Sequence, residues 1–251
     1  MKLIGISDIH GYLVPYQKLA KDYFDVLCIC GDLIPLDIQS DMQASKEWFK
    51  TEFRDWCEYM PCEKVIFIAG NHDRYLEKAL NKYGTAEKVS EHLGWSNKMV
   101  FLSDSGYTYK ELKYDTEHEI YTEREISFYG APWFPFLPNW AFYKDSKGLA
   151  EVFENIPDCD VLLTHTPGKH VFDTGRVMQY RYGEELGSEE LTDVVMRRHI
   201  GLWLCGHIHS GNHELSEFTD PKFACYKMKV ANVSIKDERY QPTYSPLEIE
   251  L

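Results

Sequence analysis

The stretch Val26-Leu27-Cys28-Ile29-Cys30-Gly31-Asp32 sets the pattern from which the fold can be read. Five apolar residues in a row are typical of a strand that is buried on both faces, as in a parallel sheet. The strand then stops at Gly31-Asp32, where glycine allows the backbone to approach its neighbours closely. Because open α/β sheets hold their sites at the carboxyl ends of parallel strands, Asp32 is a candidate site residue.

The same junction between an apolar stretch and a polar motif recurs along the chain. The five motifs are Asp8-Ile9-His10, Gly31-Asp32, Gly70-Asn71-His72-Asp73, Thr164-His165-Thr166 and Gly206-His207-Ile208-His209. Asp8 and His10 are two residues apart, so on an extended segment both side chains face the same side and can bind one metal. Asp32 has two carboxylate oxygens and can bridge two cations. Carboxylate, amide and imidazole ligands together suit Mn²⁺, Fe or Zn²⁺, and paired metals suit the hydrolysis of phosphate esters.

Hydrophobic periodicity predicts alternating strands and helices around these motifs. Strands are predicted over 2–7, 25–30, 64–69, 100–102, 106–110, 125–129, 160–163 and 201–205, with antiparallel strands in the tail at 223–235. Helices are predicted over 14–21, 41–59, 74–81, 86–92, 146–155 and 188–199. The strands at 100–102, 106–110 and 125–129 are assigned to a second sheet. The expected fold is therefore α/β, with two packed mixed β-sheets flanked by helices. Without a repeat, a low-complexity tract or a linker, residues 1–251 are expected to form a single domain.

Composition narrows the class of protein. The formal net charge is −13 over 251 residues, and such an acidic surface makes long nucleic acid a poor substrate. The N-terminal apolar stretch is too short for a signal peptide, and no apolar run reaches membrane-spanning length. Seven cysteines, an odd number scattered through apolar segments, indicate buried reduced thiols. We therefore expect a cytoplasmic protein without membrane contact, whose oligomeric state the sequence leaves open.

In this order, the five motifs resemble the calcineurin-like metallophosphoesterase superfamily. The resemblance extends from Asp8 to His209 and implies the αββα sandwich of that superfamily with two divalent metal ions. Mn²⁺ is expected first, and Fe, Zn, Ni and Mg are the alternatives. By resemblance, the ligands of one metal are Asp8, His10, Asp32 and His209, and those of the other are Asp32, Asn71, His165 and His207. His72 is then a substrate contact and the general acid that protonates the leaving group.

A finer resemblance is to small metallophosphoesterase-domain (MPPED-like) proteins. It rests on Ala131-Pro132-Trp133, Trp140-Ala141-Phe142, the segment 162–167, the segment 206–211 and Asn232-Val233-Ser234. Some members of that subfamily lack a complete G-H-x-H motif. This chain has both histidines, which favours an active dinuclear site.

One position departs from the superfamily pattern G-D-x-x-D, in which the second Asp supports the catalytic histidine. Pro35 stands at that position, and Asp37 is a candidate replacement two residues further along. The Arg of the protein-phosphatase pattern G-D-x-x-D-R-G is also absent, which weighs against a phosphoprotein substrate. Asp73 is expected to be structural because an acid is favoured at the start of a helix, and Arg74 is expected on a solvated helix face.

Two further segments are candidates for contact with substrate. The aromatic segment 133–143 is either a lid or base-stacking wall beside the metals, or a loop packed on the second sheet or in an interface. The segment 168–176 follows His165 directly and could be a substrate loop, in which His170 is the candidate contact. The predicted substrate-binding residues are thus Asn71, His72 and His170.

These residues predict a dinuclear metal-dependent phosphoesterase that acts on a small phosphodiester, such as a cyclic nucleotide. The expected mechanism is attack by a metal-bridging hydroxide, with His72 as the general acid. One alternative is a phosphomonoesterase or nuclease at the same site. The other is an inactive scaffold that binds metal, a nucleotide or a partner protein.

Overall fold

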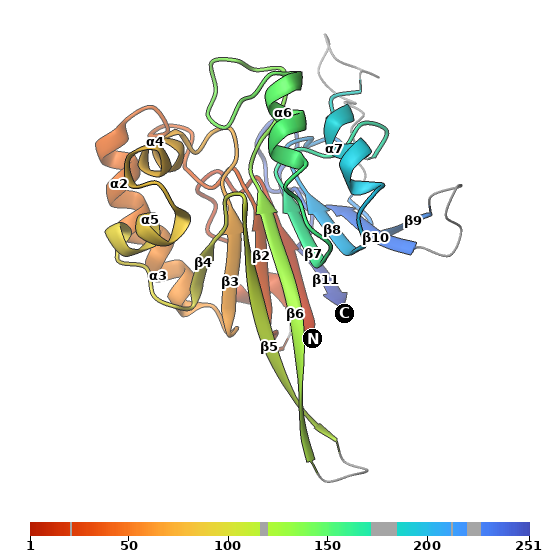
Figure 1. Ribbon diagram of the computed structural model, residues 1–251. Helices are drawn as coiled ribbons and strands as arrows, with labels where there is room; N and C mark the ends of the chain where they lie inside the picture. Colours follow the sequence, from red (N-terminus) through yellow and green to blue (C-terminus); the bar gives the residue numbers. More distant parts are fainter. Residues whose placement is uncertain (21, 116–119, 172–184, 212, 220–226) are drawn as a thin grey trace.

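The structure is a computed structural model that describes residues 1–20, 22–115, 120–171, 185–211, 213–219 and 227–251 (Figure 1). Its first sheet has the strand order β11-β1-β2-β3-β4. The strands are β1 (Lys2–Ile6), β2 (Val26–Cys30), β3 (Lys64–Ile68), β4 (Met99–Phe101) and β11 (Leu247–Glu250). β1 to β4 are parallel, and β11 pairs antiparallel with β1. Every residue of β2 is buried, which explains its uninterrupted apolar sequence.

The second sheet has the strand order β5-β6-β7-β8-β10-β9. The strands are β5 (Ser105–Asp115), β6 (Ile120–Ala131), β7 (Cys159–Thr164), β8 (Ile200–Cys205), β9 (Ser216–Thr219) and β10 (Lys227–Asn232). β5 and β6 form a long antiparallel hairpin that projects beyond the body of the sheet (Figure 1). β6, β7, β8 and β10 are parallel, and β9 pairs antiparallel with β10.

Helices cover the outer face of each sheet. The first group is α1 (Tyr16–Leu19), α2 (Met42–Lys50), α3 (Glu52–Tyr59), α4 (Arg74–Tyr83) and α5 (Ala86–Leu93), and the second is α6 (Ser146–Phe153) and α7 (Glu189–Val195). α2 to α5 lie on the first sheet, and α6 and α7 lie on the second (Figure 1). The two sheets pack face to face over a buried core that includes Cys28, Cys30 and Leu163. The predicted αββα sandwich is confirmed, whereas the single domain over 1–251 stays a prediction.

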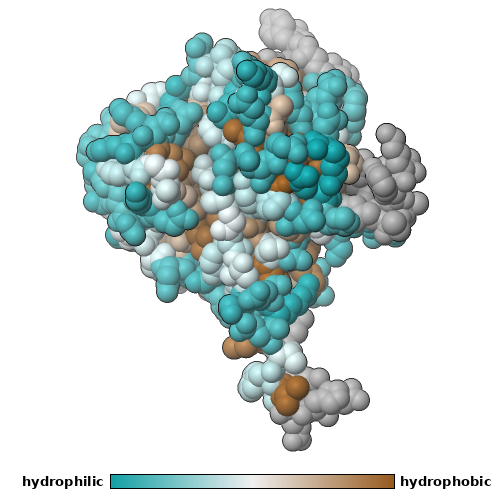
Figure 2. All heavy atoms as spheres, in the orientation of Figure 1, coloured by the Kyte–Doolittle hydropathy of each residue, from teal (hydrophilic) through white to brown (hydrophobic). Residues whose placement is uncertain are grey.

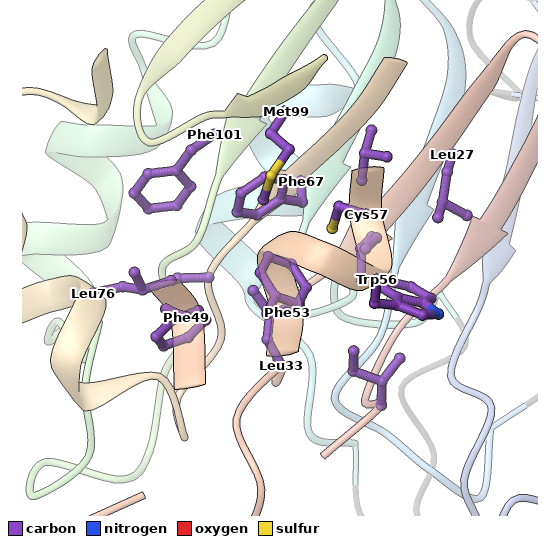
Figure 3. Close-up of a cluster of buried hydrophobic side chains, with 14 of the residues drawn as sticks. Leu27, Leu33, Phe49, Phe53, Trp56, Cys57, Phe67, Leu76, Met99 and Phe101 are labelled. Carbon is purple, nitrogen blue, oxygen red and sulfur yellow. The ribbon is translucent and has the colours of Figure 1, made fainter. Parts of the chain in front are cut away.

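Aromatic rings hold the first helical layer to its sheet. Phe53 of α3 lies edge-to-face on Phe67 of β3, with ring centroids 5.3 Å apart, and Phe67 stacks on Phe101 of β4 at 5.4 Å (Figure 3). Large rings of this kind dominate core energetics. The face shown in Figure 2 is mostly hydrophilic, in keeping with the acidic composition.

Several predicted elements differ from the structure. The strand predicted over 100–102 lies in the first sheet, because β4 pairs with β3. The helix predicted over 41–59 is two helices, since Thr51 has non-helical backbone angles (φ −121°, ψ −86°). The helices predicted over 14–21 and 188–199 are shorter, at Tyr16–Leu19 and Glu189–Val195.

The tail was only partly predicted. β10 pairs antiparallel with β9 but parallel with β8, and residues 223–226 lie outside the described part of the chain. β11 was not predicted. Its side chains alternate with only one fully buried residue, a weak signal for an edge strand.

The six described cysteines are free and buried, as predicted, and Cys225 lies outside the described residues. Within the described ranges, none of the helices has the length and apolar character needed to cross a bilayer.

Candidate metal centre

The five motifs meet where the carboxyl ends of both sheets face each other. Asp8, Asp32 and Asn71 follow β1, β2 and β3 of the first sheet, whereas His165 and His207 follow β7 and β8 of the second. The predicted ligands are buried except His207, which is half-buried. The centre is therefore built from both sheets.

The backbone at the centre is strained in a way that fixes the ligands. Asp8, His10, Asp32 and His207 have positive φ angles of 55°, 40°, 54° and 67°. Non-glycine residues in this region cost of order 1–3 kcal/mol each and cluster at functional sites. Position 70 requires glycine because of close packing and not because of its φ angle: a Cβ there would collide with the Asp32 carboxylate.

The ligand atoms fall into three groups, two of which contain Asp32. Three sets have their ligand atoms within 4.8 Å of one another: Asp8 with His10 and His209, His10 with Asp32 and His72, and Asp32 with His165 and His207. Oδ2 of Asp32 lies 3.7 Å from His10 Nε2, while Oδ1 lies 3.5 Å from His165 Nε2. The two oxygens of Asp32 thus face different histidines.

Two observations show that the donor set fits a cation. First, both ring nitrogens of His10 are buried and make no hydrogen bond to any described residue, an arrangement that costs free energy. Second, His165 faces two acceptors, with Nδ1 2.9 Å from the Cys30 carbonyl and Nε2 2.9 Å from Asn71 Oδ1. Burial lowers the pKa of His165, which favours neutral imidazole with a single N–H. A cation between Nε2 and the amide oxygen would satisfy both groups.

Backbone carbonyls orient two of the candidate ligands. His165 Nδ1 donates to the carbonyl of Cys30, and His209 Nδ1 lies 2.9 Å from the carbonyl of Asp237. Hydrogen bonds of this type fix the ring orientation and leave Nε2 for the metal. The role of the seven residues as ligands stays a prediction that this geometry supports.

Burial and neighbouring charges shift the pKa values of several residues at the centre. Burial, and then the neighbouring Asp8, raise the pKa of Asp32 well above its usual value. Burial lowers the pKa of His209, but Asp8 and the Asp237 carbonyl outweigh it and raise the value to about 9. Burial lowers the pKa of His10 and of His207.

Metal binding should therefore release protons. The raised pKa of His209, about 9, means that its imidazole is protonated at neutral pH, and this proton must leave before Nε2 can bind a metal. We expect the release of at least about one proton per protein at pH 7, and an affinity for Mn²⁺ that rises with pH toward about 9. Calorimetric titration in two buffers of different ionisation enthalpy measures this release. His209→Gln should reduce it and His92→Gln should not, while a heat independent of buffer would contradict the expectation.

His72 lies beside the cluster and is held by a residue that sequence reasoning missed. Its Nδ1 is 2.6 Å from Oε1 of Gln39, and the Gln39 amide donates in turn to the carbonyl of Leu36. The neighbour that supports His72 is thus Gln39 rather than the candidate Asp37. No periodicity marks Gln39, because the segment from Pro35 to Ser40 is a series of turns.

Asp73 is structural, but not as a helix cap. Its side chain makes no capping bond to α4. It accepts hydrogen bonds from the backbone N–H groups of Leu33, Ile34 and Gly70, and so joins the loops after β2 and β3. Arg74 was expected to be solvated, yet its Cζ lies 4.9 Å from the centre of the Trp140 ring.

The aromatic segment 133–143 is partly core and partly cavity wall, and its core part packs with the first sheet and its helices and not on the second sheet as had been predicted. Phe142 is buried in the core under the first helical layer. Phe134 is also buried, 5.3 Å from the ring of His207. Leu137 and Trp140 instead line a cavity beside the metal cluster, so only this part of the segment is placed to contact substrate.

The cavity has a volume of about 330 Å³ and opens over the metal cluster. Its lining consists of Asp32, Asn71, His72, Leu137, Trp140, Leu186, His207, Ile208, His209, Glu238 and Tyr240. Sequence reasoning missed Glu238 and Tyr240, which come from the tail. His170 does not line this cavity; its side chain is 68% exposed and pairs with Glu185 at 2.8 Å. Its contact with substrate stays a prediction, and residues 172–176 of its segment lie outside the described ranges.

Comparisons with known proteins agree with this geometry. The model of a family described as calcineurin-like phosphoesterase matches residues 1–211. Metallophosphoesterase domain-containing protein 1 of Homo sapiens and that of Mus musculus are each 27% identical to the chain over 259 residues, which cover 100% of the chain and 71% of the relative. An uncharacterized protein of Methanocaldococcus jannaschii is 27% identical over 213 residues, covering 83% of the chain and 80% of that protein.

A solved structure has a similar fold. The phosphopantetheinyl hydrolase of Mycobacterium tuberculosis superposes with a TM-score of 0.50 and 16% sequence identity, over 99% of this chain and 95% of that one. At this identity the likeness concerns the fold alone.

Proposed function

The chain belongs to the calcineurin-like phosphoesterase family, and from this premise we propose that it is a dinuclear phosphodiesterase for small phosphate diesters. Family membership and the buried Asp/His cluster support the general activity, that of a metal-dependent phosphoesterase. The observation that carries the dinuclear assignment is the position of Asp32, whose two oxygens face His10 and His165. The proposed ligand sets are those named from the sequence, with Asp32 in both.

Two divalent ions at these residues would lower the pKa of a bound water and neutralise charge on the phosphate. The side chains of the protein have separate tasks. His72 lines the cavity, and its Nδ1–H donates to Gln39, so Nε2 is turned toward the reacting atoms. Burial lowers the pKa of His72 to about 3, so near neutral pH the ring is a neutral imidazole and must first take up a proton at Nε2. It would then give this proton to the departing oxygen. We propose Mn²⁺ as the first metal to test, because the site mixes carboxylate and imidazole ligands.

The charge of the cavity supports a diester rather than a monoester. Among the described residues that line it there is no Lys or Arg, while Glu238 contributes a carboxylate. A monoester carries a second negative charge near neutral pH, and the carboxylate of Glu238 in the same cavity would disfavour that additional charge. The volume suits a ligand of small-molecule size, such as a cyclic nucleotide.

The test compares bis(p-nitrophenyl) phosphate with p-nitrophenyl phosphate on metal-stripped protein to which Mn²⁺ is restored. We expect cleavage of the diester at least about tenfold faster in kcat/KM than that of the monoester, a difference of about 1.4 kcal/mol, and no cleavage without metal. Glu238→Gln should narrow this ratio, because it removes the negative charge, whereas Glu58→Gln on α3 should not.

Other results of this test would favour one of the alternative functions. A preference for the monoester would assign a phosphatase. Absence of turnover with Mn²⁺, Fe²⁺, Zn²⁺, Ni²⁺ and Mg²⁺ would leave the metal-binding scaffold.

A further inference from the structure

Two aromatic rings from distant parts of the chain border His72 in the cavity. The Trp140 ring centroid lies 4.4 Å from that of His72, and the Tyr240 ring centroid lies 6.4 Å from it. Both side chains line the cavity together with Asp32 and Asn71. We refer to Trp140 and Tyr240 as the aromatic pair.

The turn that carries Tyr240 is fixed to the metal cluster. The Asp237 carboxylate accepts hydrogen bonds from the backbone N–H groups of Arg239 and Gln241, both at 2.9 Å. The Asp237 carbonyl accepts from His209 Nδ1, also at 2.9 Å. Tyr240 itself has a positive φ of 60°, so its position depends on this network and not on local backbone preference.

The ring of Tyr240 is held edge-on above two proposed ligands. It meets the ring of His10 at 4.9 Å and 81°, and that of His209 at 5.3 Å and 84°. The residue is nevertheless 36% exposed. Its ring thus covers the cluster on one side and leaves area open toward the cavity.

The position of Trp140 is also stabilised by a neighbouring side chain. The guanidinium of Arg74 lies 4.9 Å from the centre of its ring, within the range of a cation–π contact. Leu137, Leu186 and Ile208 add apolar surface to the same cavity. The walls around His72 are thus aromatic and apolar, and two rings are held in place before any ligand binds.

We propose that the aromatic pair selects phosphate esters that carry a flat aromatic ester group, and that the turn from Asp237 to Gln241, which supplies Tyr240, is one of the two elements that determine specificity. The inference rests on the proposed phosphoesterase function. It adds a determinant of substrate choice that family membership does not supply, because the turn lies outside residues 1–211, the part of the chain that the family model matches. Any flat aromatic ring can stack on an aromatic side chain, because every such ring has a π face. The pair should therefore recognise the flat shape of the ester group and not one particular compound.

The test uses two diesters that differ only in the ring. Phenyl p-nitrophenyl phosphate and methyl p-nitrophenyl phosphate have the same leaving group and the same single negative charge. Their ratio of kcat/KM, divided by the ratio of their uncatalysed hydrolysis, isolates recognition of the phenyl group. We expect a corrected ratio of about tenfold or more for the unaltered protein with Mn²⁺, and a fall toward one in Tyr240→Ala and in Trp140→Ala.

Two variants distinguish recognition from a general effect on structure. Tyr240→Phe keeps the ring and should keep the ratio. Tyr59→Ala makes the same change as Tyr240→Ala at a residue of α3 that is 72% exposed, and it should leave both the ratio and the rate unchanged.

A binding measurement reads the same contact without turnover. Calorimetry on Mn²⁺-loaded protein should give tighter binding of phenylphosphonate than of methylphosphonate, and Tyr240→Ala should remove the difference. If neither diester is cleaved but this difference is found, the proposed function is wrong and the ring site stands. If both diesters are cleaved with a corrected ratio near one, or Tyr240→Ala retains the preference, the inference is overturned while the phosphodiesterase remains.

Discussion

Asp32→Ala should abolish turnover and remove at least one of two bound metal ions. Because Asp32 is the residue shared by both proposed ligand sets, its loss should cost more than the loss of a general acid. We expect kcat/KM to fall by more than about 10⁴-fold, the upper range for general acid–base catalysis. Steady-state rates and elemental analysis of dialysed protein measure the two effects.

The fold should survive this substitution. In the metal-free protein, burial and the neighbouring Asp8 raise the pKa of Asp32. This favours the neutral, protonated carboxyl group, so its removal leaves no buried charge without a partner. Circular dichroism should therefore be unchanged. Asp37→Ala, in the same loop, is the matched control and should keep both metals and the rate. Full activity with two metals in Asp32→Ala would refute the bridging role.

His72→Gln should retain both metals and lose rate in a way that depends on the leaving group. Loss of a general acid typically costs about 10²–10⁴-fold. That full effect is expected for an alkoxide leaving group, as in a cyclic nucleotide, because alkoxide must be protonated as it departs. For p-nitrophenolate, which leaves readily as an anion, we expect a much smaller loss.

Gln39→Ala should give a weaker form of the same result, about 10–100-fold, since it frees the His72 ring without removing it. Comparison of the two leaving groups in one set of variants is the measurement. An equal loss for both would mean that His72 binds the phosphate and does not transfer a proton to the leaving group.

The sequence predicted the parts of this protein that follow a repeating physical pattern. Buried parallel strands are continuous apolar runs, so β2 and β3 were placed almost to the residue. The motifs after them were recognisable because several metal ligands occur at short, fixed spacing. The sequence of a three-residue strand does not indicate which strand it pairs with, and for this reason β4 was assigned to the wrong sheet.

The residues that were missed lie where no pattern operates. Gln39 contacts a side chain 33 positions away from within a run of turns. Tyr240 reaches the ring of His10 from the far end of the chain. Contacts of this kind are set by the tertiary fold, and Tyr240 and Glu238 became identifiable only as walls of a cavity.

The tail has a consequence for how the protein can be shortened. Between β10 in the second sheet and β11 in the first, the chain passes from one sheet to the other and carries the Asp237–Gln241 turn on the way. A fragment that ends at residue 211 would lose β9, β10 and β11, and would leave β8 and β1 as unpaired borders of their sheets. Bare strand borders template intermolecular pairing. A recombinant fragment cut to the recognised family segment is therefore expected to precipitate, although it retains all seven proposed ligands.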